Sequence, residues 1–432
     1  AGIMGDPWRG FATAAFVAFG LGAFTGRMRR PDGEPTRREA LLTVLGLWFA
    51  VPLVGAIPFL VDGNMPFFDA WFEAMSGFTA TGATAVTDFG ALSSTLFFWR
   101  AFAQWIGGIG IIALFVAVFP QLAIAGRQLF AAEVPSPSDE RFTPRLRESA
   151  RALLWTYLVM TLIATAAYSL AGLQLGSAVL HALTTVSAAG FSPEARSFAG
   201  FPAAAQWVAI VFMTLAGANF LLQMRLLTGR PQAMWRDAEF RTYVTIFLAA
   251  SLGLTAYLVP TYGEAALRHG LFQAVLILSP TGYASVDFGA WDSAPQTILI
   301  LLMFIGGSAG SASGGVKVVR LMIIAKNTAR EVQRVLHPRA MLPVRVAGAP
   351  VPEAVLRGAA AFVTLYALTF AGLTLALALM GVDFTTAFTA SIATLGNIGP
   401  GLGAVGPMES FASLPTAAKP LLTLAMYAGR LE

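Results

Sequence analysis

Residues 75–84 read Met-Ser-Gly-Phe-Thr-Ala-Thr-Gly-Ala-Thr, and this stretch decides the fold. It follows residues 66–75, an apolar segment that is too short to cross a hydrocarbon core, because a spanning helix takes about 20 residues. The stretch itself consists mostly of small and hydroxylated residues, which are typical of extended backbone. We therefore predict a short helix that dips into the membrane from the outer side and returns as an extended strand, between two spanning helices.

The same plan recurs three more times along the chain. The small-residue stretches are 187–192, 279–285 and 395–401, and the apolar segments before them are 177–186, 265–278 and 383–394. Residues 81–91 also match residues 281–290 almost letter by letter, with one insertion. Internal repetition of this kind indicates four copies of one structural unit. In membrane transporters it places the functional site on the axis that relates the copies.

The composition supports a membrane protein throughout. Hydrophobic residues make up 56% of the 432 residues, charged residues only 12%, and the mean hydropathy is +0.68. The apolar runs are 11–26, 41–61, 96–119, 153–173, 207–227, 244–259, 298–305, 362–380 and 414–426. We therefore expect an all-α polytopic membrane protein. The absence of cysteine excludes disulfides and thiol nucleophiles.

The basic residues are grouped rather than spread. Most of the 28 Lys and Arg residues lie in four clusters, at 27–38, 127–151, 225–241 and 317–357. The stretches that alternate with these clusters carry few, and such asymmetry places the clusters on the cytoplasmic face. A polybasic surface for anionic lipid or nucleic acid is the alternative for 317–345. It explains the alternation poorly, and we expect membrane lipid but no nucleic acid as a partner.

Four extended strands at membrane depth must meet around water, because only protein or an aqueous cavity can satisfy their backbone groups there. Their carbonyl oxygens can then replace the hydration shell of a cation. Glycine permits the required backbone angles and close approach. Asp88 and Asp287 near the outer mouth could attract cations, but we favour a bracing role for them. A single glycine more often serves helix packing, and we keep that interpretation for residues 106–110.

These strings resemble the selectivity filters of the Trk/Ktr/HKT potassium transporter superfamily, and specifically its TrkH-type members. The likeness rests on residues 75–84, 186–192, 281–283 and 397–403, and extends from Arg38 to Glu432. It implies four tandem helix–re-entrant pore helix–helix repeats around a pseudo-fourfold pore, plus an extra N-terminal helix. The implied potassium-binding filter residues are Ala80, Thr81, Gly82, Ala188, Ala189, Gly190, Pro280, Thr281, Gly282, Asn397, Ile398 and Gly399. In that family threonine is common at the positions of Ala80 and Pro280.

A run of ten Gly, Ala and Ser residues, 306–315, interrupts the apolar segment 298–305. Such a run cannot form a stable lipid-facing helix, so it should line the cavity beneath the filter and is a candidate gate, residues 306–316. The resemblance implies that the loop obstructs the pore. The predicted gate residues are Gly306, Gly307, Gly310, Gly314, Gly315, Lys317 and Arg430. A phosphate-binding loop is disfavoured, because Gly315 is followed by Val316 and not by lysine.

Arg430 has two interpretations. It matches the pore-facing arginine of the family, and charges within membrane segments usually face an interior or a water path. A long basic side chain near the end of a helix can equally reach the membrane interface. The sequence leaves both open.

The predicted organisation has five parts. They are an N-terminal helix and cytoplasmic linker (1–37) and four repeats (38–145, 146–236, 237–350 with the candidate gate, and 351–432). The chain begins without methionine and stops at Glu432 within an apolar stretch, so we expect residues to be missing at either end.

The predicted function is potassium uptake across the cytoplasmic membrane of a prokaryote, with K⁺ as the transported ion and no organic cofactor. The family implies a homodimer and a TrkA-like cytosolic nucleotide-binding ring that docks near residues 126–150 and 327–345. A Na⁺- or H⁺-coupled symporter of the same fold and an alternating-access transporter are the alternatives. Alternating access is disfavoured because the expected helix breaks are neutral and lie toward the outer face. We do not expect the protein to be an enzyme. His181 has Thr184 and Thr185 nearby, but no G-x-S-x-G motif and no His–Asp pair that would form a positioned nucleophile and base.

Overall fold

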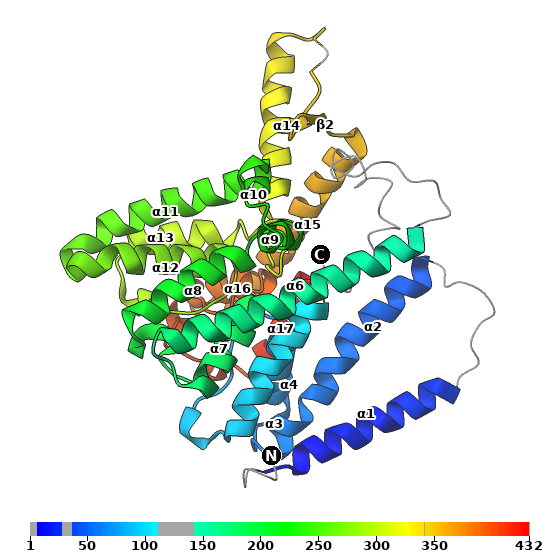
Figure 1. Ribbon diagram of the computed structural model, residues 1–432, viewed down its shortest axis with the longest axis vertical. Helices are drawn as coiled ribbons and strands as arrows, with labels where there is room; N and C mark the ends of the chain where they lie inside the picture. Colours follow the sequence, from blue (N-terminus) through cyan, green and yellow to red (C-terminus); the bar gives the residue numbers. More distant parts are fainter. Residues whose placement is uncertain (1–6, 28–36, 111–141, 341, 432) are drawn as a thin grey trace.

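The computed structural model describes residues 7–27, 37–110, 142–340 and 342–431 (Figure 1). The described part is mostly helical, with one two-stranded hairpin, as expected for an all-α polytopic membrane protein. Four of its helical spans are long and apolar enough to cross a membrane, and a fifth is if a bent helix pair counts as one. Much of the predicted linker 126–150, and the end of the predicted segment 96–119, lie outside the described residues.

The chain forms four helix–short helix–helix units, preceded by α1 (Arg9–Arg27). Unit one contains α2 (Arg37–Gly55), α3 (Ile57–Val61), α4 (Phe67–Phe78) and helical residues 94–110; unit two contains α6 (Phe142–Leu170), α7 (Leu175–Val186), α8 (Ala203–Ala216) and α9 (Phe220–Leu227). Unit three contains α11 (Ala238–Tyr262), α12 (Ala266–Leu278), α13 (Ser293–Met303) and α14 (Val318–Leu336); unit four contains α15 (Glu353–Leu379), α16 (Phe384–Leu395) and α17 (Ala418–Arg430). The short helix α10 (Gln232–Arg236) links units two and three.

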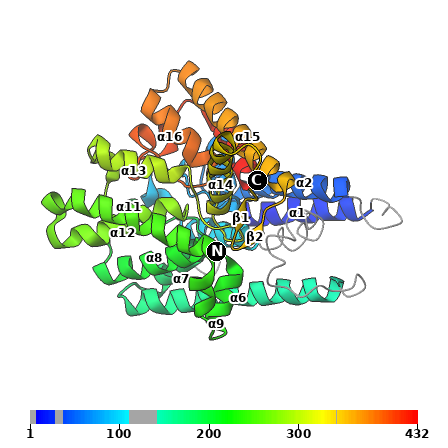
Figure 2. The ribbon, with the colours of Figure 1, turned by 90° about the horizontal axis from the view of Figure 1, so that it is seen from above.

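The four units surround a common centre. Viewed from above, α2, α6, α11 and α15 follow one another around the molecule in chain order (Figure 2). The short helices α4, α7, α12 and α16 are buried toward their C-terminal ends, where their apolar and small residues pack against the longer helices, while their first turns carry exposed side chains. This arrangement puts the C-terminal end of each short helix near the middle of the protein.

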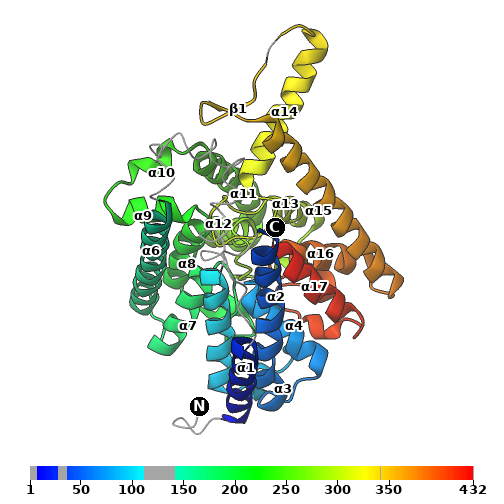
Figure 3. The same ribbon diagram turned by 90° about the vertical axis from the view of Figure 1, so that its right-hand side faces the viewer.

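α14 differs from the other helices because it projects out of the helical body (Figures 1 and 3). A small antiparallel hairpin lies beside it, in which Arg345 of β1 (Arg345–Val346) pairs with Pro350 of β2 (Ala349–Pro350). Arg330 of α14 forms an ion pair with Glu353 at the start of α15. α14 is therefore tied to unit four at Arg330, in its second half, while its last residues stand free of the body.

The segment 207–227 is not the single span that its hydropathy suggests. It breaks into α8 and α9, which are bent by 117°. Asn219 makes this break, because its side chain accepts a hydrogen bond from Leu221 N at 2.8 Å and so begins a new helix. Gly217, which ends α8, packs so tightly on Tyr243 that no side chain fits there.

The glycines of 106–110 serve helix packing, as predicted. A Cβ at Gly107 would overlap the carbonyl of Phe78, and one at Gly108 would overlap the hydroxyl of Tyr157. The small residues let the helical stretch 94–110 approach both α4 and α6 closely.

Candidate functional site

The four short helices end in the same backbone turn. In each, an N–H beyond the helix bonds to the carbonyl five residues earlier, which is the Schellman arrangement. These bonds run from Thr81 N to Ser76 O (2.9 Å), Ala189 N to Thr184 O (3.0 Å), Thr281 N to Leu276 O (2.9 Å) and Ile398 N to Ala393 O (2.8 Å). The residue before each donor has positive φ: Ala80 (53°), Ala188 (53°), Pro280 (29°) and Asn397 (50°). The four turns therefore share a backbone conformation and not one residue type at this position.

Pro280 is poorly suited to its place in this turn. Its ring favours φ near −65°, and it has no N–H for the second hydrogen bond of the cap. The position nevertheless has the left-handed backbone of its three counterparts. The packing around the turn overrides the preference of the residue.

The next glycine in each turn closes a ring. Gly82, Gly190, Gly282 and Gly399 have φ values of 84°, 74°, 78° and 105°. A Cβ added to Gly82 would overlap the carbonyl oxygen of Ala189, one added to Gly190 that of Thr281, and one added to Gly282 that of Ile398. A Cβ added to Gly399 would lie 2.9 Å from the carbonyl oxygen of Thr81. Each glycine thus lies against the turn of the following unit, and the fourth lies against the first. The four predicted filter strands meet around one axis.

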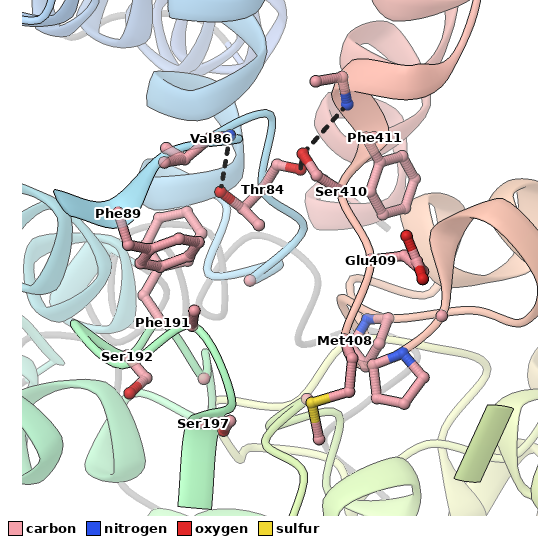
Figure 4. Close-up of a pocket in the computed structure, with 18 of the residues that line it drawn as sticks. Thr84, Val86, Phe89, Phe191, Ser192, Ser197, Met408, Glu409, Ser410 and Phe411 are labelled. Atoms are coloured by element: carbon pink, nitrogen blue, oxygen red, sulfur yellow. Dashed lines mark hydrogen bonds between the residues drawn. The ribbon is translucent and has the colours of Figure 1, made fainter. Parts of the chain in front are cut away.

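A cavity of about 480 Å³ opens over this ring. Gly82, Gly190, Gly282 and Pro400, one from each unit, contribute to its lining. The loops that follow the turns form its walls, and Thr84 and Ser410 approach one another across units one and four (Figure 4). Ser410 Oγ donates to Thr84 O at 3.1 Å, which ties these two loops together.

Asp88 and Asp287 each cap a turn of their own loop. Asp88 Oδ1 accepts from Gly90 N at 2.8 Å, and Asp287 Oδ1 accepts from Gly289 N at 2.9 Å. Each carboxylate therefore caps a short turn of its own loop, as we predicted for these two positions.

The four turns are held by different side chains. Thr79 and Thr81 share a hydrogen bond of 2.7 Å between their hydroxyls, and Ser279 and Thr281 share an equivalent one of 2.7 Å. In unit two, Gln104 Nε2 donates to Ala189 O at 2.8 Å and Gln104 Oε1 accepts from Phe191 N at 3.0 Å. In unit four, Asn397 Nδ2 donates to Thr81 Oγ1 and Met426 O, both at 2.9 Å.

A buried ion pair, which sequence reasoning missed, supports units one and two. Arg100 Nε lies 2.7 Å from Glu73 Oε1, and both side chains are almost completely buried. Glu73 also accepts from Ala85 N at 2.8 Å, and Arg100 donates to Ser192 O at 3.0 Å. The sequence contains a signal for this pair, because Glu73 and Arg100 are opposite charges within two apolar segments, and charges at membrane depth are usually paired.

We expect replacement of Arg100 by methionine to destabilise the protein by about 3–5 kcal/mol, because it leaves a buried carboxylate without its cation. Unfolding in detergent measures this. The double variant Glu73→Gln/Arg100→Met should recover much of the loss. Arg334→Met is the control, since Arg334 pairs with Glu331 at the surface and its loss should cost about 0.5 kcal/mol or less. Equal stabilities for Arg100→Met and the control would contradict the prediction.

The glycine-rich loop (residues 304–317) joins α13 to α14 and lies against the turns that end α12 and α16, on the side away from the cavity. Ser313 Oγ donates to Ser279 O at 2.9 Å, and Gly314 packs against Gly396 and Asn397. Lys317 N donates to Ile305 O at 2.8 Å, which brings the two ends of the loop together. Gly306, Gly307, Gly314, Gly315 and Lys317 are buried, as expected for a stretch that lipid does not contact, and Gly310 is partly buried.

Arg430 belongs to the same site. It is 3% exposed, and its Nη1 donates to Ala312 O at 2.7 Å while its Nη2 donates to Gly107 O at 3.2 Å. The interfacial alternative is therefore wrong, because the side chain reaches the glycine-rich loop. All predicted filter and gate residues thus lie in one contiguous region. His181 is buried and contacts Ser192 through Nε2, which fits a packing role.

Comparison with known proteins gives concordant matches. A family model described as "TrkH: Cation transport protein" matches residues 12–432. The Trk system potassium uptake proteins TrkH of Vibrio parahaemolyticus serotype O3:K6 and of Escherichia coli K12 are 36% and 35% identical, each over 98% of this chain and 89% of the relative. The Trk system potassium uptake protein TrkG of Escherichia coli K12 is 35% identical over 91% of this chain and 83% of its own length.

A solved structure is similar as well. The crystal structure of the potassium transporter TrkH from Vibrio parahaemolyticus superposes with a TM-score of 0.86 at 34% identity. The match covers 98% of this chain and 89% of that one.

Proposed function

Because this chain belongs to the TrkH family of cation transport proteins, we propose that it carries potassium ions into the cell through a pore on the axis of its four units. The ring of Gly82, Gly190, Gly282 and Gly399 is the selectivity filter in this proposal. Carbonyl oxygens of the four turns replace the water around the ion. In this proposal the chain has no catalytic role. K⁺ is the transported ion, and no organic cofactor takes part.

One observation carries the filter assignment. Each ring glycine lies against the carbonyl of the neighbouring turn, and the contacts close from unit four back to unit one. Backbone packed this closely around a centre, with a cavity of about 480 Å³ over it, offers several oxygens to one dehydrated cation. The ends of the four short helices add to the field, because a helix C-terminus carries partial negative charge.

The glycine-rich loop is the proposed gate. It lies directly against the filter turns, and Arg430 holds it from unit four. A cation leaving the filter would meet both this obstruction and the arginine charge. Opening therefore requires the loop to move away from the turns.

The cytoplasmic side supplies the control of this gate in our proposal. A TrkA-like nucleotide-binding ring docks on the face that carries α14 and residues 327–345, and the protein works as a homodimer in the inner membrane of a prokaryote. The basic clusters support this orientation, because cytoplasmic loops are rich in Lys and Arg.

Ion flux through the purified protein in liposomes tests the proposal. We expect the reversal potential to follow the K⁺ gradient and to change little when Na⁺ replaces an inert cation outside. Imposed H⁺ and Na⁺ gradients, applied separately, distinguish a passive pore from a coupled symporter. A reversal potential that follows Na⁺ as closely as K⁺ would overturn the filter assignment.

A further inference from the structure

Glu239, in the first turn of α11, is a carboxylate that the filter and gate residues do not explain. Its Oε1 accepts two backbone hydrogen bonds, from Ala309 N at 2.7 Å and from Val319 N at 3.1 Å. Ala309 is in the middle of the glycine-rich loop, and Val319 is in the first turn of α14. One oxygen atom of unit three therefore joins the loop to the helix that follows it.

Both donors need such an acceptor. The first N–H groups of a helix have no partner within that helix, and a carboxylate there is favoured by the helix dipole. The Ala309 N–H belongs to a segment without regular secondary structure, in which side chains must supply the hydrogen bonds. Glu239 satisfies both groups with the same atom, so a displacement of either one disturbs the geometry of the other.

The loop is held at the same point from unit two. Asn219 Nδ2 donates to Ala309 O at 2.9 Å, and Phe220 N donates to Gly310 O at 2.8 Å. Ser308 N donates to the carbonyl of Gly217 at 2.8 Å. Residues 308–310 are thus held by hydrogen bonds from two sides, from the break between α8 and α9 on one side and from Glu239 on the other. We call this set of hydrogen bonds the clasp.

We propose that Glu239 is the latch residue that couples α14 to the glycine-rich loop. α14 projects from the body, so force applied to its far end acts on its base, where Val319 shares the Glu239 oxygen with Ala309 (Figures 1 and 3). Tilting α14 withdraws Val319 N from the carboxylate and weakens the hold on Ala309. The loop is then released from the clasp. This inference rests on the proposed role of the loop as the gate.

The absence of native cysteine allows a direct test. Ser311→Cys changes a buried residue of the loop by one atom, so its reaction rate with a cytoplasmic thiol reagent reports loop release. We expect Glu239→Ala in this background to raise the modification rate and the basal K⁺ flux by about tenfold, or about 1.4 kcal/mol. Glu239→Gln, whose amide oxygen still accepts, should stay within about threefold of the parent.

Glu264→Ala is the matched control, because it removes an exposed carboxylate just beyond the end of α11 that is opposite to Glu239. It should leave both readouts unchanged. If Glu239→Ala does not assemble, Glu239→Asp shortens the same side chain and serves in its place. Unchanged thiol reactivity and flux in these variants would overturn the latch. If deletion of residues 307–314 also left the flux unchanged, the gate assignment itself would fail, whereas a latch failure alone would leave that deletion active.

Discussion

Replacing Gly190 with serine is expected to remove most of the preference for K⁺ over Na⁺. A Cβ at this position would overlap the carbonyl of Thr281 in the next turn, and the residue has φ of 74°, which a side chain disfavours. The turn must therefore shift, and it takes with it the carbonyls proposed to contact the ion. We expect the permeability ratio, measured from reversal potentials in liposomes, to fall by on the order of tenfold, about 1.4 kcal/mol of discrimination.

The ring also predicts a graded response. At Gly399 the nearest atom to an added Cβ, Thr81 O, would lie 2.9 Å away, so Gly399→Ser should disturb its neighbour less than Gly190→Ser. Gly372→Ser in α15 is the control, because nothing lies within 4 Å of a Cβ there. A permeability ratio in Gly190→Ser equal to that of Gly372→Ser would refute the assignment of this turn to the filter.

Deleting residues 307–314 is expected to raise the basal K⁺ flux by about tenfold or more, because it removes the proposed gate, which lies against the turns that end α12 and α16. The two residues that the deletion would join, Gly306 and Gly315, already lie close together. A Cβ at Gly306 would lie 3.2 Å from the Cα of Gly315, so the two glycines already approach the 3.8 Å spacing of bonded neighbours. Radiotracer uptake into liposomes measures the flux at equal protein density. The expected increase in flux follows from the hydrogen bonds that hold the loop against the turns, because each contributes about 1 kcal/mol.

The K⁺/Na⁺ permeability ratio is the internal control for this deletion, since the filter turns keep their own contacts. A flux equal to or below that of the parent would show that the loop does not limit conduction. A raised flux with a lost ratio would indicate that the filter had collapsed, and this would also contradict the prediction.

The four-unit plan and the position of the turn after each short helix could be predicted from the sequence, because both depend on local patterns. Ten small residues at 306–315 and the glycines at 82 and 282 are visible without any partner. The ring closure is different, because the contact of Gly399 with Thr81 joins residues from opposite ends of the chain. No local pattern contains that contact.

The sequence does not reveal the partners of Arg430 and Glu239. Arg430 could face the interior or the interface, and only its bond to Ala312 decides between them. Nothing local to Glu239 in the sequence indicates that its carboxylate reaches Ala309 and Val319. The bend at Asn219 was missed because averaged hydropathy does not register a capping side chain inside an apolar run.

The differing supports of the four turns affect the shape of the aperture. The turns of units one and three face each other across the ring, and each is stiffened by a hydroxyl pair of its own. The other two turns rest on Gln104 and on the contact of Asn397 with α17, so they follow the helices behind them. A shift of those helices would therefore stretch the opening mainly along the diameter that joins these two turns, and a round aperture would become oval.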